Sequence, residues 1–222
     1  MKHLKKTIKR NRRNRKNNKI TVIQYKYKGM FVNVFIMEVI RDCINLIGNN
    51  KFIKALETGT IRSYNERHES TRWLGETIKE GKIISVDNNP NSITVSKDIC
   101  KHLNNIEWIL GDSLEVLAKQ EKESFHFILL DSVNDRHHIF EEFKLALTLV
   151  KNGGVIMIDD FGVGSNHQIP DPTFPGAEKG VKVFKTLKEK NLLRHMHMHQ
   201  SRKGVQALFI GVKPELKKAI LG

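Results

Sequence analysis

Residues 125–131, FHFILLD, and residues 155–161, VIMIDDF, decide how the rest of the chain is interpreted. Each is an apolar run of strand length that ends on carboxylates, at Asp131 in the first case and at Asp159 and Asp160 in the second. Continuous apolar runs are typical of parallel strands with both faces covered, and ligands bind outside the carboxyl ends of such strands. We therefore expect these acids to line a cleft at one edge of a sheet.

Outward from this stretch, apolar runs alternate with segments of helical periodicity. The expected strands are Lys51–Glu57, Lys82–Asp87, Ile106–Leu110, Phe125–Asp131, Val155–Asp160, Leu192–Gln200 and Val205–Val212. The expected helices are Phe31–Ile47, Ser70–Lys79, Pro90–Leu103, Ser113–Lys119, Ile139–Val150 and Ala177–Lys190. The last two strands are joined so closely that they must be antiparallel. The pattern predicts an α/β fold: a doubly wound, Rossmann-like, mostly parallel seven-stranded sheet with a C-terminal antiparallel hairpin.

The positive charge of the chain is concentrated at its N-terminus. Residues 1–37 hold 12 Lys and Arg and no acid, which leaves 26 basic against 24 acidic residues in the remainder. We expect residues 1–28 to be a basic, disordered extension, with a weak strand pattern at Ile20–Lys28, and residues 29–222 to form one domain. The extension, chiefly residues 1–19, has two interpretations: a nucleic-acid contact through phosphates, or a solubilising tail.

The number of cysteines and the length of the apolar runs indicate the cellular compartment. The chain has two cysteines, Cys43 and Cys100, both in helical patterns, which favours a reducing environment over a disulfide framework. Its apolar runs are far shorter than the roughly 20 residues of a membrane helix, and the basic N-terminus is not followed by a secretory apolar segment. We expect a cytoplasmic protein with no membrane contact. The sequence leaves the oligomeric state open, a homodimer included.

Polar residues follow each of the first three expected strands. Glu57-Thr58-Gly59-Thr60 follows the first, Asp87 ends the second, and Gly111-Asp112-Ser113 follows the third. An acid at the end of the second strand is placed to bind the hydroxyls of a ribose. Each motif also has a purely structural interpretation: a tight turn, an Asp that starts a turn, and a helix N-cap.

Taken in this order, the motifs resemble those of the class I S-adenosylmethionine-dependent methyltransferases over about residues 31–212. The resemblance implies S-adenosylmethionine as cofactor. One departure is the longer turn at Ile61–Glu69, after which Ser70 at a helix N-terminus would meet the methionine carboxylate. The cofactor-binding residues that the resemblance implies are Glu57, Gly59, Thr60, Ser70, Asp87, Asn88, Asp112, Ser113 and Asp131.

Residues 131–136, DSVNDR, are similar to the fourth-strand motif of the metal-dependent catechol and caffeoyl-CoA type O-methyltransferases. Asp159 and Asp160 stand where that group has Asp-Asn or a similar pair. The resemblance implies a divalent cation, Mg²⁺ before Mn²⁺ or Ca²⁺, on Asp131, Asp159 and Asp160. The cation would hold two neighbouring oxygens of a small-molecule substrate and activate one hydroxyl for attack on the methyl group.

At one position this sequence departs from that motif. Asn134 occupies the place of the lysine that is the proposed general base, and an amide cannot accept a proton. Metal activation could suffice, or a histidine, His137, His138 or His167, could replace the lysine. An enzyme that has lost its activity also fits this pattern. We take Asp131, Asn134 and His137 as the catalytic candidates.

A second group of histidines, at residues 195–199, is explained by strand packing without a metal site. The run His195-Met196-His197-Met198-His199 alternates, so we expect an ordinary half-buried strand with Met inward and His outward.

Other functions remain open at this stage. The basic extension favours a nucleic-acid-associated methyltransferase or a non-catalytic RNA-binding protein of the same fold. Against nucleobase methylation, the fourth strand lacks the D/N-P-P-Y/F pattern that grips a flipped base.

Overall fold

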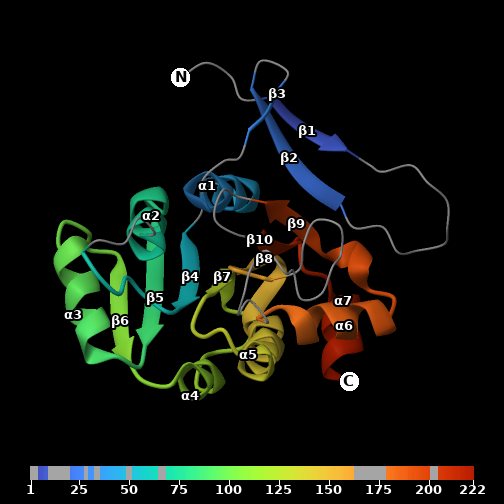
Figure 1. Cartoon of the computed structure of the whole chain (residues 1–222). Coiled ribbons are helices and arrows are strands. Elements are labelled where there is room, and N and C mark those ends of the chain that lie inside the picture. Colours follow the sequence, from blue (N-terminus) through green and yellow to red (C-terminus); the bar gives the residue numbers. More distant parts are fainter. Residues whose placement is uncertain are drawn as a thin grey trace.

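The computed structural model describes residues 5–9, 21–27, 30–32, 36–48, 52–64, 69–162, 179–200 and 205–222. In this part of the chain, helices pack on a single twisted sheet (Figure 1). The strands run in the order β1-β2-β9-β10-β8-β7-β4-β5-β6, and β3 pairs with β2. Their bounds are β1 Lys5–Lys9, β2 Thr21–Tyr27, β3 Met30–Val32, β4 Ile53–Thr58, β5 Gly81–Asp87, β6 Ile106–Leu110, β7 Phe125–Leu130, β8 Val150–Ile158, β9 His197–Gln200 and β10 Val205–Ile210.

The seven expected strands are β4 to β10, and the predicted fold class is confirmed. Strands β6, β5, β4, β7 and β8 are parallel neighbours, while β10 is antiparallel to both β8 and β9. The order reverses between β4 and β7, so the chain winds outward in both directions from the middle of the sheet. The carboxyl ends of β4, β5, β6, β7 and β8 therefore share one edge, as the sequence indicated.

The helices follow the expected pattern with shifted ends. They are α1 Ile36–Ile47, α2 Ser70–Thr77, α3 Pro90–Ile99, α4 Ser113–Ala118, α5 Arg136–Leu149, α6 Val181–Glu189 and α7 Pro214–Leu221, with a 3₁₀ turn at Leu193–His195. Helix α5 begins earlier than Ile139 because the Asp135 carboxylate accepts hydrogen bonds from the N–H groups of His137 and His138. Helix α7 was not expected.

The N-terminal region differs from the expectation in part. Strand β2 confirms the strand pattern at Ile20–Lys28, but β1 forms at Lys5–Lys9, where we expected a disordered extension. Strand β3 takes Met30–Val32, so α1 starts at Ile36 and not at Phe31. The rest of residues 1–28 lies outside the described residues, and the boundary between extension and domain stays a prediction.

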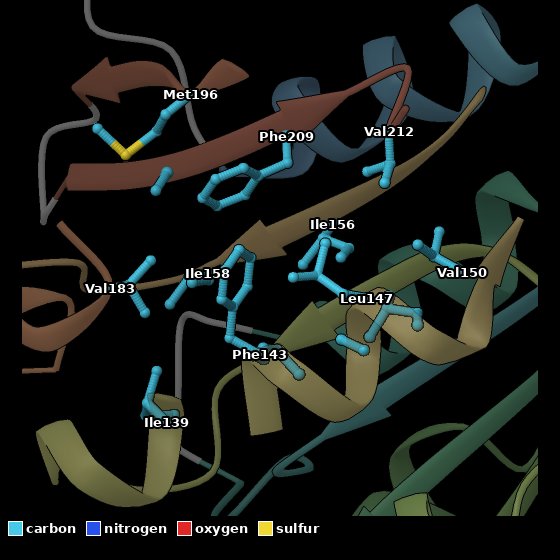
Figure 2. Packing of buried hydrophobic residues seen from close by; sticks show 14 of the residues in the cluster. Ile139, Phe143, Leu147, Val150, Ile156, Ile158, Val183, Met196, Phe209 and Val212 are labelled. Atoms are coloured by element: carbon cyan, nitrogen blue, oxygen red, sulfur yellow. The ribbon is translucent and has the colours of Figure 1, made fainter. Parts of the chain in front are cut away.

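Strand β7 is buried on both faces, as its unbroken apolar run predicts. Phe127 and Leu129 pack with α1 and α2 on one side, while Ile128 and Leu130 pack with α5 and α6 on the other. Figure 2 shows the second cluster, where Phe143 of α5 meets Phe209 of β10 with ring centroids 4.7 Å apart. These two layers hold the β7 and β8 ends rigidly in place.

No helix in the described ranges is long and apolar enough to cross a membrane.

Candidate cofactor and cation site

The turn after β4 lies directly against the end of β7. Gly59 has a positive φ of 83°, and a Cβ on it would lie 2.3 Å from the backbone oxygen of Asp131. Its N–H donates to the Val86 carbonyl at 2.8 Å. Glycine is therefore required at this position both by conformation and by space, and its absence of a side chain lets β4, β5 and β7 converge on one point.

A hollow that is open to solvent lies at this point of convergence. It brings together five of the residues that the sequence assigned to three separate strand ends: Gly59, Asp87, Asn88, Asp112 and Ser113. The residues that line it are Gly59, Val86, Asp87, Asn88, Gly111, Asp112, Ser113, Ser132, Val133 and His138.

Asp87 holds the rim of the hollow in shape. Its Oδ2 accepts from the Thr60 N–H at 3.1 Å, and its Oδ1 accepts from the Asn89 N–H at 2.8 Å. A carboxylate retains further lone pairs beyond these two bonds. Asp87 therefore has the capacity to accept from ligand hydroxyls as well, and its partly exposed position in the lining makes it accessible.

Glu57 lies beneath the turn and is completely buried. The hydroxyls of Ser70, Thr71 and Ser85 donate to its carboxylate. Burial raises its pKa to about 7, against the opposing effect of these three hydrogen bonds. Glu57 is not among the described residues that line the hollow, so the structure gives it the role of joining β4, β5 and the start of α2.

Thr60 and Ser70 also bond inward. The Thr60 hydroxyl donates to Ser96 Oγ at 2.7 Å and lies 3.0 Å from the Thr71 hydroxyl, and the Ser70 hydroxyl is used by Glu57. The direct cofactor contacts expected for Glu57, Thr60 and Ser70 stay predictions.

His138 is a lining residue of the hollow that we considered only as a base. Its Nε2 lies 2.9 Å from the Ser113 hydroxyl and 3.4 Å from Oε1 of the fully buried Glu142. Glu142 raises the pKa of His138, against the opposing effect of burial. The ring therefore fixes Ser113 at the start of α4, beside Asp112, whose Oδ1 caps the helix by accepting from the Leu114 N–H at 2.9 Å.

Three carboxylates meet next to this hollow. One oxygen from each of Asp131, Asp159 and Asp160 can be chosen so that all lie within 4.8 Å of one another. Burial, followed by the charges of Asp131 and Asp160, raises the pKa of Asp159 to about 7. The Gln206 amide donates to Asp159 Oδ1 at 2.8 Å. Hard oxygen donors that repel one another in this way fit a divalent cation such as Mg²⁺.

Asp160 has a left-handed backbone, with a φ of 46°. Its N–H donates to Asp159 Oδ1 at 2.9 Å. This bend right after β8 turns two consecutive carboxylates toward the same edge, whereas an extended strand would point them to opposite faces. Asp and Asn tolerate this conformation better than most residues.

Lys179 is a member of the site that the sequence did not reveal. Its side chain is 1% exposed, and its Nζ lies 2.5 Å from Asp131 Oδ1. Burial disfavours the charged form, but Asp131, Asp159 and Asp160 outweigh burial and raise the pKa of Lys179. In the sequence it is one of several lysines at the start of α6, so no pattern distinguished it.

The other catalytic candidates lie at the surface. Asn134 and His137 are both exposed, and Nδ1 of His137 lies 3.1 Å from Nζ of Lys182. While a lysine ammonium donates to that nitrogen, the neutral ring has no free lone pair for a proton. His167 lies outside the described residues.

The histidine run differs from the expected half-buried strand. Met198 points inward as predicted, but His199 is buried too, and its Nδ1 lies 2.9 Å from Gln206 Oε1. His195 is in the 3₁₀ turn before the strand. His199 is buried because both faces of β9 are covered, and Asp42 of α1 lies close enough for its charge to act on the ring. Through Gln206 it orients the amide that binds Asp159.

The fold of this chain is similar to that of known methyltransferases. Residues 69–161 match a family model described as a methyltransferase domain. No curated protein sequence matches the chain. An O-methyltransferase from Bacillus cereus, solved with S-adenosylhomocysteine, is 20% identical, with 81% of this chain and 82% of that chain covered and a TM-score of 0.59. TomG from Streptomyces achromogenes, an O-methyltransferase of tomaymycin synthesis solved with S-adenosylmethionine, is 18% identical, with 83% of each chain covered and a TM-score of 0.59.

A third solved structure is less similar but holds a metal. The MycE methyltransferase of the mycinamycin pathway, solved with Mg, S-adenosylhomocysteine and mycinamycin VI, is 19% identical with a TM-score of 0.51. The match covers 81% of this chain and 49% of that one. Residues 69–161 thus match a methyltransferase-domain model, and the solved structures share the fold of this chain, which is the class I methyltransferase fold.

Proposed function

We propose that this protein is an S-adenosylmethionine-dependent O-methyltransferase that uses a divalent cation to act on a small molecule with two neighbouring oxygens. The observation that carries the proposal is the position of the carboxylate cluster. Ser132 lines the hollow, and its neighbour Asp131 belongs to the cluster with Asp159 and Asp160. A cofactor in the hollow and a substrate on the cluster would be adjacent, as methyl transfer requires.

The cofactor end of the proposal rests on the lining residues. S-adenosylmethionine, when bound, supplies the electrophilic methyl group. Asp87 and Asn88 would accept from the ribose, and Asp112 and Ser113 would contact the adenine edge, with the exposed side chain of Val133 in the same wall. Gly59 lets the backbone of the turn approach the methionine part.

The substrate end rests on the three acids. A divalent cation would lower the pKa of a bound hydroxyl and hold the adjacent oxygen. The Mg in the MycE structure supports Mg²⁺ as the first ion to test. With the hydroxyl acidified in this way, Asn134 would only orient the substrate as a hydrogen-bond partner. His137 would act as proton acceptor once its contact with Lys182 is released, a role that His137→Gln tests.

The direct test is a panel of catechols and other vicinal diols with labelled S-adenosylmethionine, run with Mg²⁺ and with EDTA. We expect transfer only with the metal. Methyl transfer that is unchanged by EDTA would overturn the cation mechanism, and absence of S-adenosylmethionine binding in calorimetry would overturn the whole proposal.

Asp160→Asn should lower Mg²⁺-dependent turnover at least about tenfold, because one of three charged ligands is lost. Asparagine retains the left-handed backbone, so the fold should be undisturbed. Turnover at saturating cofactor checks this, with Glu141→Gln on the surface of α5 as the matched control. Equal turnover in Asp160→Asn and wild type would remove Asp160 from the site.

Asp87→Asn should weaken S-adenosylhomocysteine binding about tenfold, because an amide accepts more weakly than a carboxylate from ribose hydroxyls. Isothermal titration measures the dissociation constant. Asp98→Asn, the same change at an exposed residue that is not part of the lining, serves as control. An unchanged constant in Asp87→Asn would argue against a ribose at this rim.

A further inference from the structure

Lys179 is held in the carboxylate cluster by the packing of its neighbour. The N–H of Gly180 donates to the Phe161 carbonyl at 2.9 Å, and a Cβ on Gly180 would lie 2.3 Å from Phe161. Phe161 is itself completely buried and follows directly after Asp160. The backbone beside Lys179 is thus fixed to the segment that carries two of the three acids.

The charges that act on the Lys179 side chain are those of the carboxylate cluster. It is buried, its Nζ is 2.5 Å from Asp131 Oδ1, and the charges of Asp159 and Asp160 act on it as well. Lysine is almost never fully buried without a partner, so these acids account for its position. The ammonium uses one of the oxygens of Asp131, the same residue that the proposed cation requires.

We propose that Lys179 is the protein's own counter-cation for the carboxylate cluster, and that its ammonium opposes the binding of a divalent cation to Asp131, Asp159 and Asp160. This inference rests on the cation site of the proposed function and adds a determinant of its affinity. Two cations a few ångströms apart repel strongly even at an effective dielectric constant of about 20. The ion must therefore displace the ammonium from Asp131 or bind beside it, and both routes lower its affinity.

A purely structural ion pair makes a different prediction. If Lys179 only anchors the start of α6, removing it would disturb Asp131 and weaken or leave unchanged the binding of a metal. If Lys179 opposes the metal, its removal leaves three acids without their cation, and the metal binds more tightly. The sign of the change in affinity separates the two.

The experiment is a titration of the full chain with Mn²⁺, followed by the electron paramagnetic resonance signal of the free ion. Lys179→Met should bind Mn²⁺ at least about tenfold more tightly than wild type, given the size of the Coulomb interaction removed. Lys179→Gln, which can still donate to Asp131, should shift affinity in the same direction. Lys179→Arg, which keeps the charge, should stay within about threefold of wild type on the same argument.

Lys182→Met is the matched control, because Lys182 lies in the same helix and contacts His137 and the Phe140 ring, away from the acids. A second readout, the rise in melting temperature with Mn²⁺, should be larger in Lys179→Met than in wild type and applies even if the metal-free variant is only marginally folded. Affinity in Lys179→Met and Lys179→Gln that is equal to or weaker than in wild type would overturn the inference alone. No Mn²⁺ binding to any variant would overturn the cation site and the inference with it.

Discussion

Gly59→Ala is expected to lower the free energy of unfolding by about 3–5 kcal/mol and to abolish binding of S-adenosylhomocysteine. A Cβ at this position lies 2.3 Å from the Asp131 backbone oxygen, and neither backbone can yield without moving the end of β4 or β7. The φ of 83° adds a conformational cost, since a side chain rarely adopts it. Gly59 follows β4 and Asp131 follows β7, so any relief of the clash displaces one of two residues of the candidate site.

Gly153→Ala separates the two contributions. Gly153 has almost the same φ, 84°, but a Cβ there would meet nothing within 4 Å. This variant should lose only about 1 kcal/mol, the conformational cost alone. Urea unfolding at one pH gives both values, and calorimetry gives cofactor binding. If the two variants lose equal stability, the close approach of the β4 turn to Asp131 is not what makes Gly59 necessary.

The fold could be predicted because buried parallel strands leave a plain sequence pattern. The apolar runs of β7 and β8 end on acids, and the order of the strand-end motifs fixed which edge collects them. Asp87, Asn88, Asp112 and Ser113 reached one hollow because parallel strands present their carboxyl ends together.

Lys179 could not be predicted for a physical reason. A lysine at the start of a helix is normally solvated, and nothing in its sequence neighbours shows that Gly180 packs against Phe161. His199 is a similar case, because both faces of β9 are buried, whereas the alternation of His and Met predicts one exposed face. Long-range packing decides both, and local periodicity does not encode it.

For Glu57 the sequence predicted the position but not the contacts of the side chain. The sequence correctly predicted its position at the end of β4. A role in cofactor binding was inferred because that strand end lies near the expected ligand site. In the structure its carboxylate binds three hydroxyls, including those of Ser70 and Thr71 in α2. Serine and threonine at a helix start are ordinary capping residues, so their attachment to a buried acid from β4 had no signal of its own.

Glu57→Gln is expected to become more stable relative to wild type as pH rises, by about 3 kcal/mol between pH 4 and pH 8. Burial raises the pKa of Glu57 from 4.5 to about 7 in the folded protein. At pH values between these two, Glu57 therefore takes up a proton when the protein folds. A group with a raised folded pKa stabilises the protein fully below pH 4.5, and that contribution is lost as pH rises through about 7.

Glutamine stays neutral throughout and can accept from Thr71 and Ser85 while donating to Ser70, so the variant lacks this loss. Urea unfolding of both proteins from pH 4 to pH 8 gives the difference in unfolding free energy, in which the titration of Asp159 cancels. Glu80→Gln, the same change at an exposed residue, should run parallel to wild type. A Glu57→Gln curve that also runs parallel to wild type would show that Glu57 ionises in the folded protein without cost, and that the three hydroxyls fully compensate for its burial.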